Sequence, residues 1–432
     1  MCAQNGAEQK GVARARIMVQ QAQSALSAGD YAGAISKYEQ ALVSAPGNAE
    51  AEIGLGQAYR AIHNYDEAKE ILERAAREHP KNEVALATLG NLEIELQTYE
   101  PAKQHLAAAL ELKPDDAMTR IWLAVAYKSA GDPTNALAQL GKVLARDPNN
   151  ALAYYERAQI YSNQDRDADA LRDAEKAVEL KPNPLAKIEL AKALLRMPLQ
   201  ADAGESAKRC TRAVEVLEPL ADAQEKNLTA ADSDASGSRS SDSDTLFLLS
   251  RAYQCAGQRD KLQKVLAEFQ AASKNDRTMK QNQTEAKHLV QQANDAGVKN
   301  DLAGALDLLQ QALEKDPQSG AAYSQLAKLY YSAGDVEKAS DAITKAVSID
   351  AYQPDFLYVQ GKIFEKQGKF DEALAAFERT TLVNPKESDA YFEMGTIYAQ
   401  RKDVVRARAA FKKAVELSPD DADYRRALAS VK

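Results

Sequence analysis

Prolines recur along this sequence at a constant interval, and that interval constrains the fold more than any other feature. The spacing of 34 residues matches one helical hairpin with short turns, because an α-helix needs about 3.6 residues per turn. The period therefore predicts a stack of similar helical pairs. The in-phase positions of the 432-residue chain are Pro46, Pro80, Pro114, Pro148, Pro182, Pro317, Pro385 and Pro419, with Ala351 in the remaining slot.

The other columns of the repeat separate small side chains from large ones. We number each repeat so that the proline is position 32; in the nine in-phase repeats position 8 is then glycine or alanine, and position 20 is alanine. Position 11 is often tyrosine, and position 24 is bulky in most repeats. Small residues let two helices approach closely, and large residues fill the space on either side. Pairs such as Gly131-Asp132 near positions 15 and 16 predict the turn between the two helices.

These columns resemble the tetratricopeptide repeat (TPR) superfamily, whose pattern places Gly, Tyr, Ala, Phe and Pro at the same offsets. The resemblance implies an all-α fold, a right-handed TPR α-solenoid of about eleven helical hairpins plus a C-terminal capping helix. The stretch that matches the pattern best contains Tyr391, Met394, Gly395, Tyr398, Ala407, Phe411 and Pro419.

Breaks in the period divide the chain into segments. Residues 1–14 are polar and are expected to form a flexible N-terminal tether, followed by repeats 1–6 over 15–221. Residues 222–242 are acidic and Ser-rich, which favours a linker or long loop. Repeats 7–11 are expected over 243–432, with the capping helix at 422–432. The pattern allows either one superhelix with a loop or two arrays joined by a hinge.

Composition and motifs argue against several classes of function. The net charge of −8 does not favour a nucleic-acid-binding surface, and no apolar run is long enough for a transmembrane segment. The four histidines share no helix face, and no phosphate loop, Gly-x-Ser-x-Gly or His-Glu-x-x-His motif is present. We therefore expect a non-enzymatic protein with no catalytic residues, no cofactor and no metal.

The cysteines lead to two expectations. Three cysteines at wide spacing argue against a disulfide framework, so Cys210 and Cys255 are expected to be buried, inert thiols. Cys2 follows Met1 and precedes a polar stretch, as at the mature start of a bacterial lipoprotein. This arrangement suggests lipidation of Cys2 and a lipid anchor to a membrane; the alternative is an ordinary cytosolic N-terminus with a chance cysteine.

The resemblance also implies a partner-binding surface, because TPR proteins line a concave groove with the helix A residues at positions 2, 5, 9 and 12. An alternative of equal weight is that position 5 packs against the next repeat. A chaperone-type carboxylate clamp is disfavoured, since Asn294 is accompanied by Val290 where the clamp needs lysine. The expected groove residues are Val19, Ile53, Ile121, Tyr155, Phe247, Tyr358 and Phe392 at position 5, and Asn91, Asn294, Lys328 and Lys362 at position 9.

Together these patterns predict a scaffold that binds protein or peptide partners in the groove. By family analogy we expect a bacterial assembly factor of an envelope or secretion-type complex, lipid-anchored at the periplasmic face of the cell envelope. The alternative is a soluble cytoplasmic peptide-binding adaptor or co-chaperone-like protein. A third class, the regulatory part of a larger enzyme, is disfavoured by the capping helix expected at 422–432.

Overall fold

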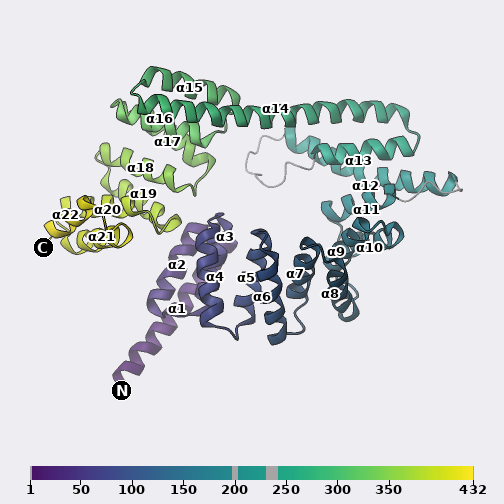
Figure 1. The fold of residues 1–432 in the computed structure, drawn as a ribbon, viewed down its shortest axis with the longest axis horizontal. Helices are drawn as coiled ribbons and strands as arrows, with labels where there is room; N and C mark the ends of the chain where they lie inside the picture. The colour runs from purple at the N-terminus through teal and green to yellow at the C-terminus, as the bar shows by residue number, and fades with distance from the viewer. Residues whose placement is uncertain (1, 197–202, 230–241, 432) are drawn as a thin grey trace. The chain divides into compact units, whose positions relative to one another are not determined.

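The computed structural model describes residues 2–196, 203–229 and 242–431, which form helices and no strand (Figure 1). The helices are α1 (Cys2–Ser27), α2 (Tyr31–Ser44), α3 (Ala49–Ala61), α4 (Tyr65–Glu78), α5 (Glu83–Glu95), α6 (Tyr99–Leu112), α7 (Ala117–Ser129), α8 (Pro133–Arg146), α9 (Ala151–Asn163), α10 (Asp167–Leu180), α11 (Pro184–Arg196), α12 (Ala203–Thr229), α13 (Asp242–Cys255), α14 (Arg259–Val298), α15 (Leu302–Lys315), α16 (Gly320–Ser332), α17 (Val336–Ile349), α18 (Pro354–Lys366), α19 (Phe370–Val383), α20 (Ser388–Gln400), α21 (Val404–Leu417) and α22 (Ala422–Ser430).

Consecutive helices pair as the 34-residue period predicts. Eleven hairpins account for α1 to α21 if the 40-residue helix α14 serves twice, as helix B of repeat 7 and helix A of repeat 8. The short helix α22 follows the last hairpin and contacts α21. The all-α solenoid of about eleven hairpins with a C-terminal cap is therefore confirmed.

Within a hairpin, the glycine of position 8 packs directly against the large side chain of position 24. A Cβ atom added to Gly90 of α5 would lie 2.6 Å from Cγ of Leu106 on α6 and 3.2 Å from the carbonyl oxygen of Ala102. Ala102, at position 20, is fully buried. The columns recognised in the sequence are thus the residues at which helices A and B touch.

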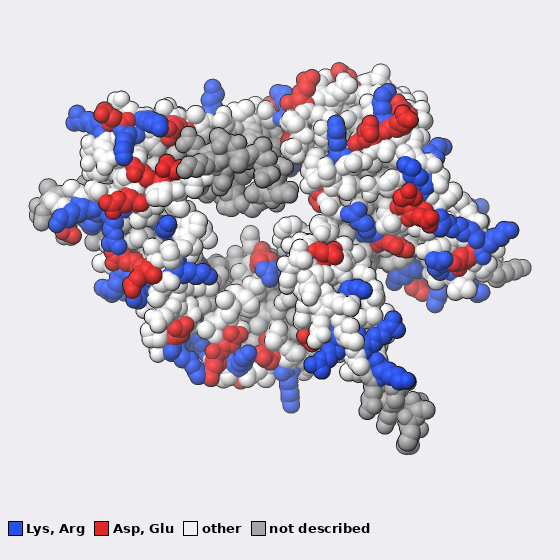
Figure 2. Space-filling view, turned by 180° about the vertical axis from the view of Figure 1, so that it is seen from behind, with Lys and Arg blue, Asp and Glu red and all other residues white. Residues whose placement is uncertain are grey.

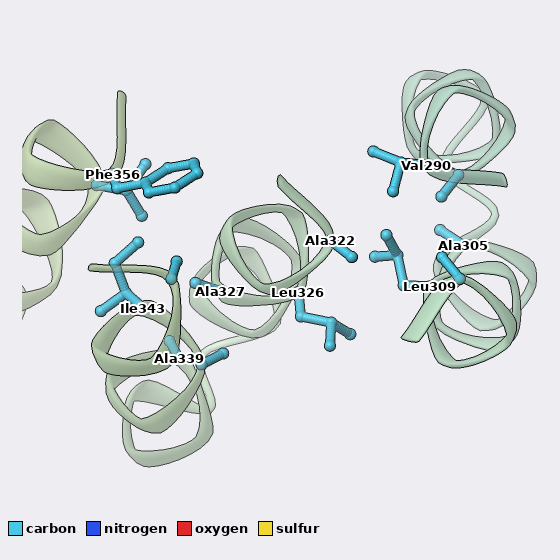
Figure 3. Close-up of a cluster of buried hydrophobic side chains, with 14 of the residues drawn as sticks. Val290, Ala305, Leu309, Ala322, Leu326, Ala327, Ala339, Ile343 and Phe356 are labelled. Atoms are coloured by element: carbon cyan, nitrogen blue, oxygen red, sulfur yellow. The ribbon is translucent and has the colours of Figure 1, made fainter. Parts of the chain in front are cut away.

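The same contacts recur over α14 to α18, where buried side chains form one cluster. In Figure 3, Ala305 and Leu309 of α15 lie beside Val290 of α14, and Ile343 of α17 lies toward Phe356 of α18. Each large side chain therefore contacts both its own hairpin and the next one, so the core continues from repeat to repeat.

The turn between helices A and B has a common backbone conformation. The residue at position 15 has a positive φ in all ten repeats whose turn is described. The next residue closes the turn: the N–H of Asp132 donates to the carbonyl of Tyr127 at 2.9 Å, and its side chain accepts from the N–H of Asn135 at 3.1 Å. The position 15 residues are Gly29, His63, Gln97, Gly131, Asp165, Gly257, Asn300, Gly334, Gly368 and Lys402.

Two segments differ from the expectation of irregular structure. Residues 2–14 belong to α1, because a stretch rich in Ala, Gln, Glu and Lys simply extends helix A of repeat 1. The tether expected at 1–14 is therefore wrong. Residues 222–229 continue α12, so the expected linker 222–242 is helical at its start; its Ser-rich core, 230–241, lies outside the described residues.

The expectation for the two internal cysteines is also wrong. Cys210 of α12 and Cys255 of α13 form a disulfide, with their Cα atoms 5.5 Å apart. The two helices pack against each other, which brings together residues 45 positions apart in the sequence. The irregular spacing of repeats 6 and 7 concealed this proximity.

Contacts divide the chain into two compact units. The end unit joins Met1–Glu78 with Thr278–Lys432, and the middle unit comprises His79–Arg277. The expected division lay at 222–242. The observed division differs because residues 1–78 contact residues 278–432, and its second boundary falls inside α14, between residues 277 and 278. In the described part of the chain, no helix has both the length and the apolar character needed to cross a membrane.

Candidate functional site

Three of the expected groove residues are buried in the structure. Val19, Ile53 and Ile121 expose 6% of their surface or less. Ile121 of α7 belongs to the same buried cluster as Ala153 and Ile160 of α9. The next helix A covers position 5 at Val19 and Ile121, since α1 contacts α3 and α7 contacts α9. All three side chains are buried and offer no surface to a partner. Their assignment to the groove is corrected accordingly.

The aromatic residues at position 5 are only partly accessible. Phe392 stacks on Tyr424 of α22 with ring centroids 4.9 Å apart, and it also contacts Phe411 at 5.7 Å. Tyr358 contacts the ring of Phe377 at 5.7 Å. Burial and the nearby carboxylate of Glu393 raise the pKa of Tyr358. These two side chains hold the C-terminal repeats together, so replacing them would disturb the cap as well as any groove.

The other two aromatic residues of this row differ. Tyr155 is half-buried, and its hydroxyl accepts a hydrogen bond from Nε2 of Gln159 at 2.6 Å. Phe247 on α13 is exposed, although its ring also contacts Phe269 of α14 at 5.7 Å. Phe247 is thus the one member of the expected position 5 set that is well exposed.

The polar residues expected at position 9 lie nearer the surface. Asn91 and Asn294 are half-buried, and Lys328 is exposed. Lys362 bridges Glu365 and Glu393, both at 2.8 Å. Burial lowers the pKa of Lys362, but hydrogen bonds from its ammonium to the two carboxylates outweigh this effect and raise the pKa.

Lys362 belongs to a series of polar contacts that connect successive A helices. Nζ of Lys128 on α7 donates to Glu156 of α9 at 2.6 Å, and the Ser162 hydroxyl donates to Glu189 of α11 at 2.8 Å. The repeat pattern did not indicate these contacts, because each joins one position of a repeat to a different position of the next. Such pairs restrict the rotamers of the polar side chains in the free protein, which lowers the conformational entropy lost on binding a partner.

A row of exposed apolar side chains lies at the second residue of helix A in four successive repeats of the middle unit. We call this set the apolar row: Val84, Met118, Leu152 and Leu185 are 47%, 44%, 39% and 62% exposed. The helices that carry them, α5, α7, α9 and α11, contact one another in order. Apolar side chains that stay accessible in register on neighbouring helices are a typical feature of an interaction surface.

The apolar row has no counterpart of large apolar side chains in the described part of the end unit, where α16 carries the small Ala321 as its second residue. The second residues of α3, α18 and α20 in the end unit are Glu50, Asp355 and Asp389. The signal was present in the sequence at position 2, because three of the four apolar residues follow the 34-residue period. The fourth, Leu185, is displaced by one residue, since α11 begins at Pro184.

The distribution of charged side chains does not mark a binding surface as clearly as the apolar row does. Figure 2 shows acidic and basic side chains interspersed over the face that it displays. Many of them pair locally, such as Arg406 with Asp403 at 2.5 Å and Lys176 with Glu179 at 3.0 Å. Exposed pairs of this kind contribute little to stability and form a solvated surface.

Comparison with known proteins agrees with this geometry. Two family models described as tetratricopeptide repeat match the chain, one over residues 123–184 and 358–422, the other over 25–92, 61–127 and 299–363. The chain is a tetratricopeptide repeat protein. The TPR fold is generally a non-catalytic scaffold for protein–protein interaction, and that general role applies here.

Two curated proteins match parts of the TPR chain. "Cellulose synthase operon protein C" of Xanthomonas axonopodis pv. citri (strain 306) is 32% identical over 166 residues, which is 36% of this chain and 11% of that protein. "Protein O-mannosyl-transferase TMTC1" of Homo sapiens is 30% identical over 132 residues, or 31% of this chain and 15% of that protein. This chain therefore spans only a small part of either relative.

Solved TPR structures resemble single stretches of the chain. The crystal structure of MamA protein is 24% identical, with a TM-score of 0.35, and the match covers 39% of this chain and 92% of MamA. The structure titled "Crystal structure of YrrB: a TPR protein with an unusual peptide-binding site" is 28% identical, with a TM-score of 0.34 over 39% of this chain and 88% of that one.

Proposed function

We propose that this TPR protein is an assembly scaffold of a bacterial envelope or secretion-type complex, and that the apolar row is its main partner-binding surface. The observation that carries the proposal is the exposure of Val84, Met118, Leu152 and Leu185 in four successive repeats. Fully burying a large apolar side chain contributes about 1.5–3 kcal/mol, so these four half-exposed residues can each supply about 1 kcal/mol of binding energy.

The spacing of the row suggests what a partner segment must present. Packed helices lie about 8–10 Å apart. Residues three apart in an extended segment, or seven apart in a helix, are separated by about 10 Å. We therefore expect the partner to place aliphatic or aromatic side chains at one of these intervals along the row.

The Cys210–Cys255 disulfide supports a location in the envelope. Disulfides persist in oxidising compartments such as the bacterial periplasm and are rare in the cytosol. The bond joins two buried or half-buried residues of adjacent helices, as a structural disulfide does. The cytoplasmic adaptor remains the alternative; there we expect both cysteines to be reduced.

Site-specific photocrosslinking tests the binding surface. A photoreactive amino acid at Met118 or Leu152 should give the same crosslinked partner in the native host, and the same probe at Val43 should not. Val43 is a matched control, because it is an exposed aliphatic residue on α2, a helix that carries no member of the row. Aspartate at the two neighbouring row positions should abolish the adduct. Equal crosslinking at Val43, or an adduct that survives these aspartates, would contradict the proposal.

Mass spectrometry of the natively produced protein tests the anchor. If Cys2 carries a lipid anchor, the N-terminal peptide should begin at Cys2 with diacylglycerol on its sulfur, and the protein should sediment with membranes. An unmodified N-terminus in the soluble fraction would exclude the lipoprotein proposal and leave the binding surface unaffected.

A further inference from the structure

The two segments of the end unit meet at the C-terminus of α19. The last carbonyls of a helix have no partner within the helix. Here the Tyr59 hydroxyl donates to the carbonyl of Leu382 at 3.1 Å, and Nδ2 of Asn64 donates to the carbonyl of Val383 at 2.7 Å. Side chains of repeat 2 thus satisfy the end of a helix in repeat 10.

A lysine between α19 and α20 forms the charged part of the same contact. Nζ of Lys386 lies 2.7 Å from Glu67 and 2.9 Å from Glu70, both on α4. Hydrogen bonds to these two carboxylates raise the pKa of Lys386. The hydrogen bond and charge of Lys386 in turn lower the pKa of Glu70, so both ions are favoured over a wide pH range.

The contact has a polar, solvent-exposed edge beside the buried Tyr59 and Val383, unlike the apolar cores between consecutive repeats. Lys386 and Glu70 are more than half exposed, and a cavity of about 440 Å³ separates parts of the two segments. The rings of Tyr31 and Tyr352 meet at 5.8 Å beside it. Exposed ion pairs are weak and are screened by salt, so a contact of this type can open without unfolding the repeats.

We propose that repeat 2 and the α19–α20 corner form a reversible clasp within one chain. The clasp consists of Tyr59, Asn64, Glu67 and Glu70 on one side and of Leu382, Val383 and Lys386 on the other. When closed, it pairs the polar side chains of repeat 2 with the α19–α20 corner; when open, it releases these side chains and frees two helix carbonyls. The clasp is independent of the apolar row, which lies in the middle unit.

Distance measurements between spin labels test the clasp in the full-length protein. Labels at Arg77→Cys and Ala375→Cys occupy exposed sites on α4 and α19, in a Cys2→Ser background that leaves the disulfide intact. At low ionic strength the labels should give one short, narrow distance distribution. About 1 M NaCl should shift the distribution to longer, broader distances, because the Debye length falls to about 3 Å.

Charge reversal provides the decisive comparison. Lys386→Glu should remove most of the short-distance population at low ionic strength, and Glu67→Gln/Glu70→Lys/Lys386→Glu should restore it. Asn64→Asp should also open the clasp, because it keeps the side-chain oxygen that accepts from the N–H of Glu67 at 3.4 Å but loses the amide donor. Lys412→Glu is the matched control, since Lys412 pairs with Glu416 of its own helix.

Two results would overturn the proposal. In the first, Lys386→Glu leaves the low-salt distances unchanged while circular dichroism shows the same helicity as in wild type. In the second, the short distance disappears when labelled protein is diluted with an excess of unlabelled protein; the contact would then join two copies of the chain.

Discussion

At the scale of single residues, helices A and B can pack closely because glycine at the contact has no Cβ atom. A Cβ added to Gly90 would meet both the flexible side chain of Leu106 and the rigid backbone oxygen of Ala102. Gly141 is also helical, on α8, but a Cβ added there meets nothing within 4 Å. The same substitution should therefore have opposite effects at these two glycines.

Gly90→Ala should destabilise the protein by ~1–3 kcal/mol, because the added methyl group overpacks a filled interface. Gly141→Ala should stabilise it by ~0.5–1 kcal/mol, because alanine loses less conformational entropy than glycine in a helix. Chemical denaturation of the two variants checks this pair. A neutral Gly90→Ala would mean that Leu106 can move aside.

The left-handed turn residues allow a second prediction. Non-glycine side chains cost roughly 1–2 kcal/mol in this conformation, and Gln97 and Lys402 occupy it with φ near 60°. Gln97→Gly and Lys402→Gly should each raise stability by ~0.5–1 kcal/mol, since greater freedom of the unfolded chain offsets part of the gain. Gly131→Ala should lower stability in the same thermal melts. An unchanged midpoint in all three variants would contradict the strain argument.

These columns also show which residue roles the sequence could predict. Positions 8, 20 and 24 were recognisable because each contact lies inside one repeat and recurs every 34 residues, as for Gly90 and Leu106. Position 5 was ambiguous because its burial depends on the next repeat. Ile121 is covered by α9, whereas Phe247 is exposed. Periodicity alone cannot separate these two cases.

At the scale of elements, the disulfide stabilises the most irregular part of the array. It connects α12 to α13 across 45 residues, where the repeat pattern is weakest. A covalent link of this span restricts the unfolded chain and typically contributes about 2–5 kcal/mol. The bond therefore compensates for the departures from the pattern in repeats 6 and 7.

Reduction of the wild-type protein should lower its unfolding midpoint, consistent with a loss of ~2–5 kcal/mol. The variant Cys210→Ala/Cys255→Ala should show the same lowered midpoint and no further response to reductant. Thermal melts with and without dithiothreitol check this expectation. If reductant leaves the unfolding midpoint of the wild-type protein unchanged, the disulfide is absent or does not stabilise the fold.

Fused or extended elements were the least predictable ones. The repeat pattern did not indicate that α14 would run without interruption through 40 residues. The turn that normally separates helices B and A is replaced there by polar residues with good helix propensity. The same propensity converts residues 2–14 from a tether into the first turns of α1.

At the scale of the whole molecule, the end unit is not contiguous in sequence, and this could not be predicted from repeats that look alike. Its consequence is visible at Glu39 of α2, which lies near Tyr59 of α3 and Tyr391 of α20 and shares a cavity with Arg14 of α1. Burial raises the pKa of Glu39 to about 7, although a hydrogen bond with Tyr59 partly opposes the shift.

The stability of the end unit should therefore depend on pH. A carboxyl group whose pKa is raised on folding contributes stability that is fully present below its unfolded value of about 4.5 and is lost as pH rises through 7. Glu39→Gln should be more stable than wild type at pH 8 by ~1–3 kcal/mol and nearly equal to it at pH 4.5. Chemical denaturation of both proteins at several pH values checks this. If their free energies of unfolding change with pH in parallel, the prediction is wrong.

The disulfide between Cys210 and Cys255 also changes what a single cut in the chain can do. It closes a covalent ring that includes residues 230–241. A protease that cleaves once between the two cysteines leaves both fragments attached, so the nicked protein migrates as one species until it is reduced. Repeats 1–6 and repeats 7–11 can therefore separate only after two chemical events, hydrolysis of a peptide bond and reduction of the disulfide.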